Sequence, residues 1–147
     1  MSRTISYRGQ LASGDQETIA LHTINGKTGY RIVKFVMMTP NAGTTDYEQT
    51  IKIYKTQQSS VDADIDFTDN RLLAAGFTEG AAATNFIGNP LLVFFDNEIF
   101  NQDIYVTQFD AKSALACNYY IELEAVDLSL DEQTVATLKD IRNVGAE

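Results

Sequence analysis

At 147 residues, of which 44% are hydrophobic, the chain can bury one sizeable core, and global disorder is therefore not expected. Twenty acidic residues against eleven basic ones give a net charge of −9, which disfavours a main role in binding nucleic acid or anionic lipid, whose phosphates carry the same sign of charge. Cys117 is the single cysteine, so no intrachain disulfide can form, and no apolar run approaches the ~20 residues that a membrane helix needs.

In the first part of the chain, apolar and polar residues alternate with the period of two that is typical of strands with one wet face. This pattern predicts strands over residues 4–11, 17–24, 27–38 and 49–56. Asn25-Gly26 stands between the second and third of these strands. Because this pair accepts the positive φ angles of a type I′ turn, it predicts a hairpin.

The strand predicted over residues 27–38 is apolar on both sides, which indicates a central strand or one that is covered twice. Ile32 and Val36 fall on one side, whereas the other side carries Val33, Phe35 and Met37. Gly29 is a candidate position for a β-bulge.

Turn-rich segments divide the second half of the chain. Residues 57–70 form a polar, acidic stretch, and residues 79–90, which are rich in Gly, Ala and Asn, are predicted to be an exposed loop. Between and after these segments, strands are predicted over residues 72–77, 91–98, 103–109 and 118–125.

The period changes at the C-terminal end. Ser129 and Glu132 have the spacing of a capping box, apolar residues follow at helical spacing up to Ile141, and Gly145 is a candidate C-cap. We therefore predict an α-helix over residues 130–143. Its apolar stripe requires a docking surface, either on its own domain or on a neighbouring subunit.

Together these elements predict a mainly β fold. About seven or eight short strands at turn-spaced intervals favour an antiparallel β-sandwich, jelly-roll-like, with a C-terminal α-helix. The sandwich would span residues 3–127 as one domain, and residues 128–147 would form a C-terminal helical extension. The period-two placement predicts a core that includes Ile5, Tyr7, Val33, Phe35, Ile53, Val106, Ile121 and Leu123.

Asp62, Asp64 and Asp66 alternate in the acidic stretch and would line one face of an extended segment, as calcium ligands can. The EF-hand template fails, because counting from Asp62 its sixth position is Phe67 and its twelfth is Leu73. We expect a solvated acidic loop or a charged edge that blocks strand pairing, with calcium binding as the alternative.

Catalytic equipment is sparse, and we expect no enzyme, no cofactor and no metal ligands. His22 is the single histidine, so His22 and Cys117 form the only possible thiol–imidazole dyad, and a buried apolar cysteine is the simpler interpretation. Glu122 and Glu124 are two residues apart, which places both on the wet face of the last strand. Tyrosines, among them Tyr47, Tyr54, Tyr119 and Tyr120, could stack on sugar, but they also enrich protein–protein contacts, which we favour.

Several runs of the sequence resemble small virion proteins of marine tailed bacteriophages, over most of residues 3–125. The similar runs are Tyr7-Arg8-Gly9-Gln10-Leu11, Asn25-Gly26-Lys27-Thr28-Gly29-Tyr30, Phe95-Asp96-Asn97-Glu98, Asn101-Gln102-Asp103-Ile104-Tyr105-Val106-Thr107 and Cys117-Asn118-Tyr119-Tyr120-Ile121-Glu122-Leu123-Glu124. The resemblance implies a non-enzymatic structural role, with fibre or tail attachment as variants. Such proteins are commonly β-sandwiches that oligomerise on the capsid.

From this resemblance we expect a capsid decoration (cement) protein of a bacteriophage virion, which is assembled in the host cytoplasm and stabilises the shell through subunit contacts. Its partners would be the major capsid protein or other virion proteins and further copies of itself, with no direct contact to nucleic acid or membrane. The alternative is a carbohydrate-binding or receptor-binding β-sandwich module of a tail or head fibre.

Overall fold

The computed structural model describes residues 3–22, 26–41, 45–84, 86–129 and 137, apart from the side chain of Ile87. Among these residues it is mainly β, and every pair of neighbouring strands is antiparallel. No helix in the described part of the chain is long and apolar enough to cross a membrane.

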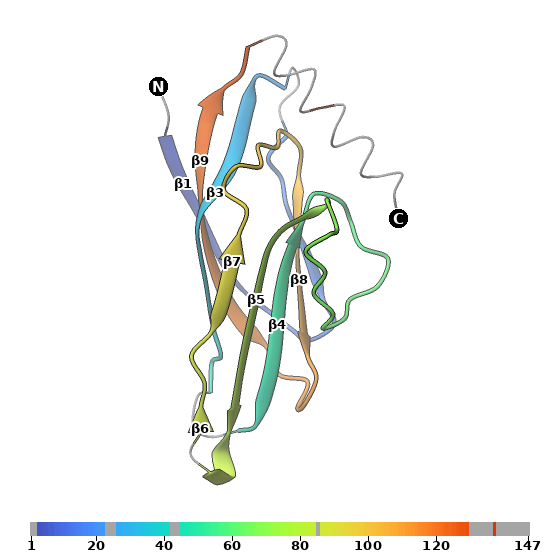
Figure 1. Ribbon diagram of the computed structural model, residues 1–147, viewed down its shortest axis with the longest axis vertical. Coiled ribbons are helices and arrows are strands. Elements are labelled where there is room, and N and C mark those ends of the chain that lie inside the picture. Colours follow the sequence, from blue (N-terminus) through green and yellow to red (C-terminus); the bar gives the residue numbers. More distant parts are fainter. Residues whose placement is uncertain (1–2, 23–25, 42–44, 85, 130–136, 138–147) are drawn as a thin grey trace.

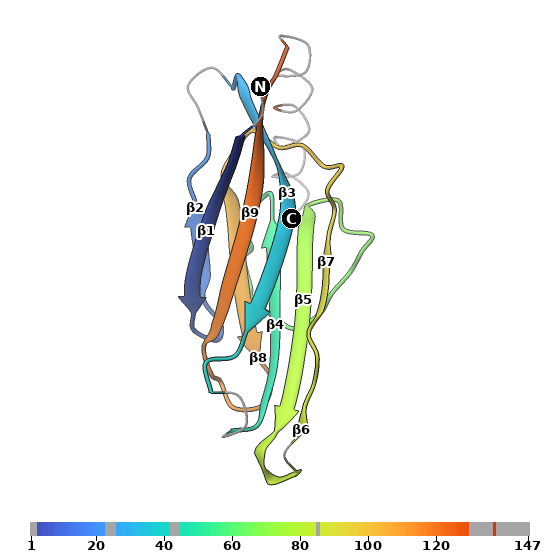
Figure 2. The same ribbon diagram turned by 90° about the vertical axis from the view of Figure 1, so that its left-hand side faces the viewer.

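Two sheets face each other along the length of the molecule (Figures 1 and 2). One has the strand order β1-β9-β3, built from β1 (Arg3–Leu11), β9 (Cys117–Asp127) and β3 (Thr28–Met38). The other has the order β2-β8-β4-β5-β6, with β7 also paired to β5. It is built from β2 (Gln16–Ile19), β8 (Ile104–Asp110), β4 (Tyr47–Tyr54), β5 (Leu72–Ala81), β6 (Phe86–Ile87) and β7 (Leu91–Phe94). The predicted antiparallel, sandwich-like arrangement of β-sheets is confirmed.

Sequence alternation in β9 translates directly into an inner and an outer face. Its odd-numbered residues from Cys117 to Ala125 are buried between the sheets, and its even-numbered residues from Asn118 to Val126 lie half-exposed on the outside. β9 is central in its sheet, with β1 on one side and β3 on the other. Its inner face therefore forms the middle of the core.

The predicted core is confirmed for most of its members. Five of them are buried: Phe35, Ile53, Val106, Ile121 and Leu123. Ile5 and Tyr7 are partly buried and pack against this core. Val33 is the exception, because it is only half-buried.

A β-bulge explains the error at Val33. The pairing of β3 with β9 shifts register between Ile32 and Lys34, so Val33 has no direct partner. The extra residue changes the phase of the alternation. As a result Ile32 faces the core together with Phe35 and Met37, all three at most 3% exposed. The predicted bulge at Gly29 is wrong, because Gly29 pairs with Val126 in regular register. Close packing accounts for the glycine instead, since a Cβ there would lie only 2.9 Å from side-chain carbons of Ile99 and Leu128.

The predicted hairpin at Asn25-Gly26 is also wrong. β2 pairs with β8 in one sheet and β3 pairs with β9 in the other, so the connection between β2 and β3 crosses from sheet to sheet. Gly26 does have the positive φ, +64°, that its type allows. The segment predicted to be a loop, residues 79–90, contains regular secondary structure: β5 continues to Ala81 and is followed by a 3₁₀ turn, η1 (Ala82–Thr84), and by β6.

Asp110 organises the turn between β8 and β9. Its carboxylate accepts hydrogen bonds from the backbone amides of Lys112, Ser113 and Leu115, at 2.8–3.2 Å. Burial opposes ionisation of this carboxyl, but the backbone donors outweigh burial and lower its pKa. The turn also contains Ala114, at a φ of +53°.

At its C-terminal end the sandwich extends one residue beyond β9. Leu128 is buried, and its amide donates to the carbonyl of Lys27 at 2.8 Å. The predicted helix, residues 130–143, lies outside the described residues except for Thr137. The hydroxyl of Thr137 accepts a hydrogen bond of 2.9 Å from the side-chain amide of the buried Asn101.

Candidate interaction surfaces

The outer face of the three-stranded sheet carries a shallow groove of about 480 Å³. Its walls come from three strands: Arg8 of β1, Tyr120 and Asn118 of β9, and Val36 and Met38 of β3. The pairing places Arg8, Tyr120 and Val36 in one row across the sheet. Met38 is 63% exposed, so the groove has a prominent apolar rim.

Arg8 differs from Arg31 and Lys34 of this face in having no ion pair among the described residues. On the same face, between β3 and β9, Arg31 pairs with Glu124 at 2.9 Å and Lys34 lies 3.9 Å from Glu122. Glu122 and Glu124 thus stand on the wet face, as their spacing predicts, and each faces a cation there. Within the described part of the chain Arg8 has no ion pair, and its guanidinium is therefore available to an outside carboxylate.

Tyr120 is the aromatic side chain of the groove. Its hydroxyl donates to Glu122 at 2.7 Å, which fixes the ring along β9. This hydrogen bond is the main cause of the raised pKa of Tyr120. The ammonium of Lys34 stands 5.8 Å from the ring centroid.

The other three tyrosines singled out in the sequence are buried and do not extend this surface. Tyr47 and Tyr54 lie within β4, and Tyr119 faces inward. Gly9 leaves room for the ring of Tyr119, and the Tyr119 hydroxyl donates a hydrogen bond to Glu17 of β2, an edge strand of the other sheet. Burial, followed by the contact with Glu17, raises the pKa of Tyr119. The four tyrosines therefore do not form one exposed platform.

The connection between β4 and β5, residues 55–71, contains the acidic stretch and covers part of the outer face of the larger sheet. Lys52 of β4 holds it there: its side chain is 5% exposed, and its Nζ donates to the Asp62 carboxylate at 2.8 Å and to the Asp64 carbonyl at 2.7 Å. The hydrogen bond from Lys52 is the main cause of the lowered pKa of Asp62. We call this segment the clamped loop.

Asp62, Asp66 and Asp69 of the clamped loop each have a separate side-chain partner. Asp66 accepts hydrogen bonds from the amide and hydroxyl of Thr68, and Asp69 pairs with Arg71 at 2.9 Å. No three His, Cys, Asp or Glu side chains among the described residues are grouped as a metal site would require. Asp62, Asp64 and Asp66 therefore lie in an acidic loop, as one of the two interpretations of the sequence predicts, and calcium binding stays the alternative.

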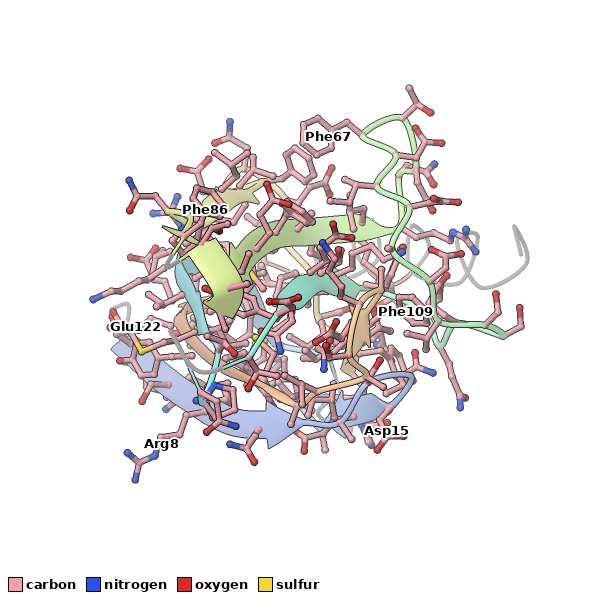
Figure 3. The ribbon with its side chains drawn as sticks, turned by 90° about the horizontal axis from the view of Figure 1, so that it is seen from below. Arg8, Asp15, Phe67, Phe86, Phe109 and Glu122 are labelled. Atoms are coloured by element: carbon pink, nitrogen blue, oxygen red, sulfur yellow. The ribbon has the colours of Figure 1, made fainter. Side chains whose placement is uncertain are left out.

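The clamped loop also exposes two large apolar side chains. Ile65 is 40% exposed and Phe67 is 61% exposed, and both stand next to Asp66 in the sequence. Phe67 contacts the edge of the Phe95 ring, with 5.7 Å between centroids. In Figure 3 Phe67 lies on the side of the molecule opposite Arg8.

A third surface follows the β6–β7 edge of the larger sheet. Leu91 is 72% exposed and Phe86 is 49% exposed, and the half-buried Phe77 pairs with Leu91 across the sheet. β7 has the sequence LLVF and carries no charge, whereas β2, at the opposite edge, exposes Glu17 and Thr18. An uncharged apolar edge is unusual, because natural sheets protect their edges with charges. We call Phe77, Phe86 and Leu91 the apolar strip.

The hypothetical dyad of His22 and Cys117 is wrong. His22 Nδ1 lies 2.6 Å from Asp103 Oδ1 at the start of β8, whereas Cys117 pairs with Leu11 near the other end of that strand. The seven residues of β8 correspond to about 20 Å. Cys117 is fully buried, and burial raises the pKa of its thiol to about 12, so the thiolate is disfavoured at neutral pH.

No protein-family model and no curated protein matches this chain.

The sequence pattern placed Tyr120, Glu122 and Glu124 on the wet face of β9. It did not reveal the groove, because Arg8, Met38 and Tyr120 come together only through the pairing of β1 and β3 with β9.

Proposed function

We propose that this protein is a non-enzymatic structural component of a bacteriophage virion, most directly a capsid decoration (cement) protein that stabilises the shell through subunit contacts. The sequence resemblance supports the virion setting. We further propose that its sandwich is jelly-roll-like and that residues 130–143 form the helix indicated by their pattern. The hydrogen bond between Asn101 and Thr137 favours packing of that segment on its own subunit.

The apolar strip is the observation that carries this proposal. Exposed apolar side chains on adjacent strands lose contact with water when another protein covers them, at about 25 cal/mol per Å² of buried area. Two of the three side chains are about half-exposed or more. The strip also lies beside an unprotected sheet edge, where a partner could both cover the side chains and pair with the backbone.

The test has two parts. Mass spectrometry of purified virions, with copy-number estimation, should find this chain in many copies per particle. Purified protein should then bind to shells that lack it, and Leu91→Lys should weaken this binding about ten-fold or more, because burying a leucine contributes about 1.5–3 kcal/mol. The matched control is Thr18→Lys, which places the same charge on the opposite, exposed edge of the same sheet.

Absence of the chain from virions would refute the proposal, as would equal binding by the two lysine variants. The carbohydrate-binding alternative has one observation in its favour, the half-exposed Tyr120 beside the amides of Gln10 and Asn118, which are joined at 3.0 Å. It predicts that isolated protein retains a polysaccharide and that Tyr120→Ala abolishes this retention.

A further inference from the structure

We propose that copies of this chain associate head to tail, with the tip of the clamped loop of one copy, residues 63–68, seated in the groove around Arg8 of the next. This inference deepens the proposed function by naming a partner surface. It rests on that function only for the setting in which many copies meet.

The loop tip presents carboxylates and apolar side chains together. Ile65 and Phe67 are exposed, and they alternate with Asp64 and Asp66 along the chain. Among the described contacts Asp64 uses only its backbone: its carbonyl accepts from Lys52 and its amide donates to Asp62, so its carboxylate remains available. Because Lys52 holds the loop on the sheet, little conformational freedom would be lost when the tip docks.

The groove has the complementary chemistry. Arg8 supplies the guanidinium that an aspartate can bind in a bidentate manner, and Val36, Met38 and Tyr120 supply apolar and aromatic contacts beside it. Methionine is adaptable and suits irregular apolar partners such as Ile65 and Phe67. The groove volume, about 480 Å³, is within the range of roughly 300–1,000 Å³ that is typical of ligand pockets.

Charge complementarity favours a second copy as the occupant. The chain carries −9, and the neighbouring cations Arg31 and Lys34 already face Glu124 and Glu122. Among the described residues Arg8 is thus an unpaired cation on an acidic molecule, and the acidic tip is a segment that every copy supplies. Docking also covers Met38, Ile65 and Phe67, three of the large apolar side chains that the described surface leaves exposed.

The two surfaces lie on opposite sheets, and Figure 3 shows Phe67 and Arg8 on opposite sides of the molecule. One copy therefore cannot satisfy both surfaces by itself, and a two-fold dimer would not use them. The contact is heterologous, and repetition of it produces a ring or an open array.

Sedimentation of the purified full chain at physiological salt, where the Debye length is about 8 Å, tests the contact without any shell present. Wild-type protein should form concentration-dependent species larger than a dimer. Arg8→Glu inactivates the groove, and Asp64→Asn with Asp66→Asn neutralises the tip while asparagine can still cap the turn at Thr68. Each variant alone should associate at least ten-fold more weakly.

Mixing the two variants gives the decisive result. The intact tip of the Arg8→Glu chain can enter the intact groove of the chain that carries Asp64→Asn and Asp66→Asn. The groove of the first chain and the tip of the second are both inactive. The mixture should therefore contain a one-to-one dimer and nothing larger. Arg3→Glu, an exposed site on the same strand, and Asp15→Asn, in an exposed turn, are matched controls that should behave as wild type.

A wild-type chain that stays monomeric up to about 1 mM would overturn the inference. It would also be overturned by variants that associate like wild type, or by a mixture of the two variants that forms no one-to-one dimer. Equal thermal midpoints for all variants would show that each has folded. Shell binding and its loss in Leu91→Lys are measured separately. Failure of the head-to-tail contact can thus be distinguished from failure of the proposed function.

Discussion

Ile32 and Val33 are consecutive β-branched residues of β3 with different environments. Ile32 is 1% exposed in the core, and Val33 occupies the irregular position of the β-bulge and is half-buried. The bulge also places Lys34 on the outer face beside Glu122 and Tyr120. One residue therefore sets both the packing of the core and the chemistry of the outer face.

We expect Ile32→Ala to lower the free energy of unfolding by about 2–5 kcal/mol, because it removes fully buried methyl groups and leaves a cavity. Val33→Ala should lower it by about 1 kcal/mol or less, since that side chain is only half-buried. Urea denaturation monitored by circular dichroism measures both. Thr4→Ala, at an exposed site of β1, is the control, and a larger loss for Val33→Ala than for Ile32→Ala would contradict the bulge.

At the scale of elements, the clamped loop joins β4 to β5 and shields a face of the sheet that would otherwise be wet. The outward residues Lys52 and Tyr54, which lie beside the loop, are at most 8% exposed. Tyr54 and Leu72 form a small second apolar cluster with Ala75, against which Val93 and Phe95 pack. The loop is therefore part of the folded structure, and Lys52 attaches its acidic part to the sheet.

We expect Lys52→Met to accelerate amide hydrogen exchange in residues 62–70 about ten-fold or more, because hydrogen bonds to charged groups contribute about 1.5–3 kcal/mol. The sandwich itself should keep its stability, since methionine is apolar and leaves no buried charge behind. Lys112→Met is the matched control: Lys112 is half-exposed and stands 3.8 Å from Glu48. Unchanged exchange in the loop would show that Lys52 does not hold it.

The same attachment should depend on pH in a defined direction. The pKa of Asp62 is lowered mainly by the hydrogen bond from Lys52, so this bond is fully present above the usual aspartate value of about 3.9 and is lost as the pH falls through the lowered pKa. After correction for intrinsic exchange rates, the wild-type loop should therefore approach the Lys52→Met behaviour only below about pH 4. An approach at neutral pH would contradict the assignment.

At the scale of the whole molecule, the sandwich ends beyond its last strand. Leu128 is 8% exposed, packs close to Gly29 and donates its amide to Lys27. Leu128 therefore packs with the sandwich, although it lies one residue beyond the domain boundary that we expect at residue 127.

We expect a chain that ends at Ser129 to unfold cooperatively, whereas a chain that ends at Asp127 should melt roughly 4–10 °C lower than the chain ending at Ser129, because it loses the buried Leu128. Thermal denaturation of the two truncated chains compares them directly. Equal midpoints would show that Leu128 contributes little. Failure of the Ser129 chain to fold would show that the sandwich requires residues 130–147.

Much of the fold could be predicted from local sequence, because a strand with one wet face imposes a period of two on its own residues. β1 follows this rule from Thr4 and β9 follows it up to Val126, and Ile121, Leu123 and Ile53 are buried as the rule predicts. The acidic composition of residues 57–70 likewise marked them as a loop, since closely spaced aspartates neither pack in a core nor favour strands. These properties depend on residues that are near one another in the sequence.

Only the tertiary structure decided which strands pair and where the surfaces form. Asn25-Gly26 permits a hairpin, but long-range pairing places β2 and β3 in different sheets. A β-bulge that has no signal in the local sequence buries Ile32 in the core and leaves Val33 half-buried. The separation of His22 from Cys117, and the convergence of Arg8, Met38 and Tyr120 in one groove, depend on which segments become neighbours. Alternation fixes the face that a side chain occupies, but it carries no information about the strand that will lie beside it.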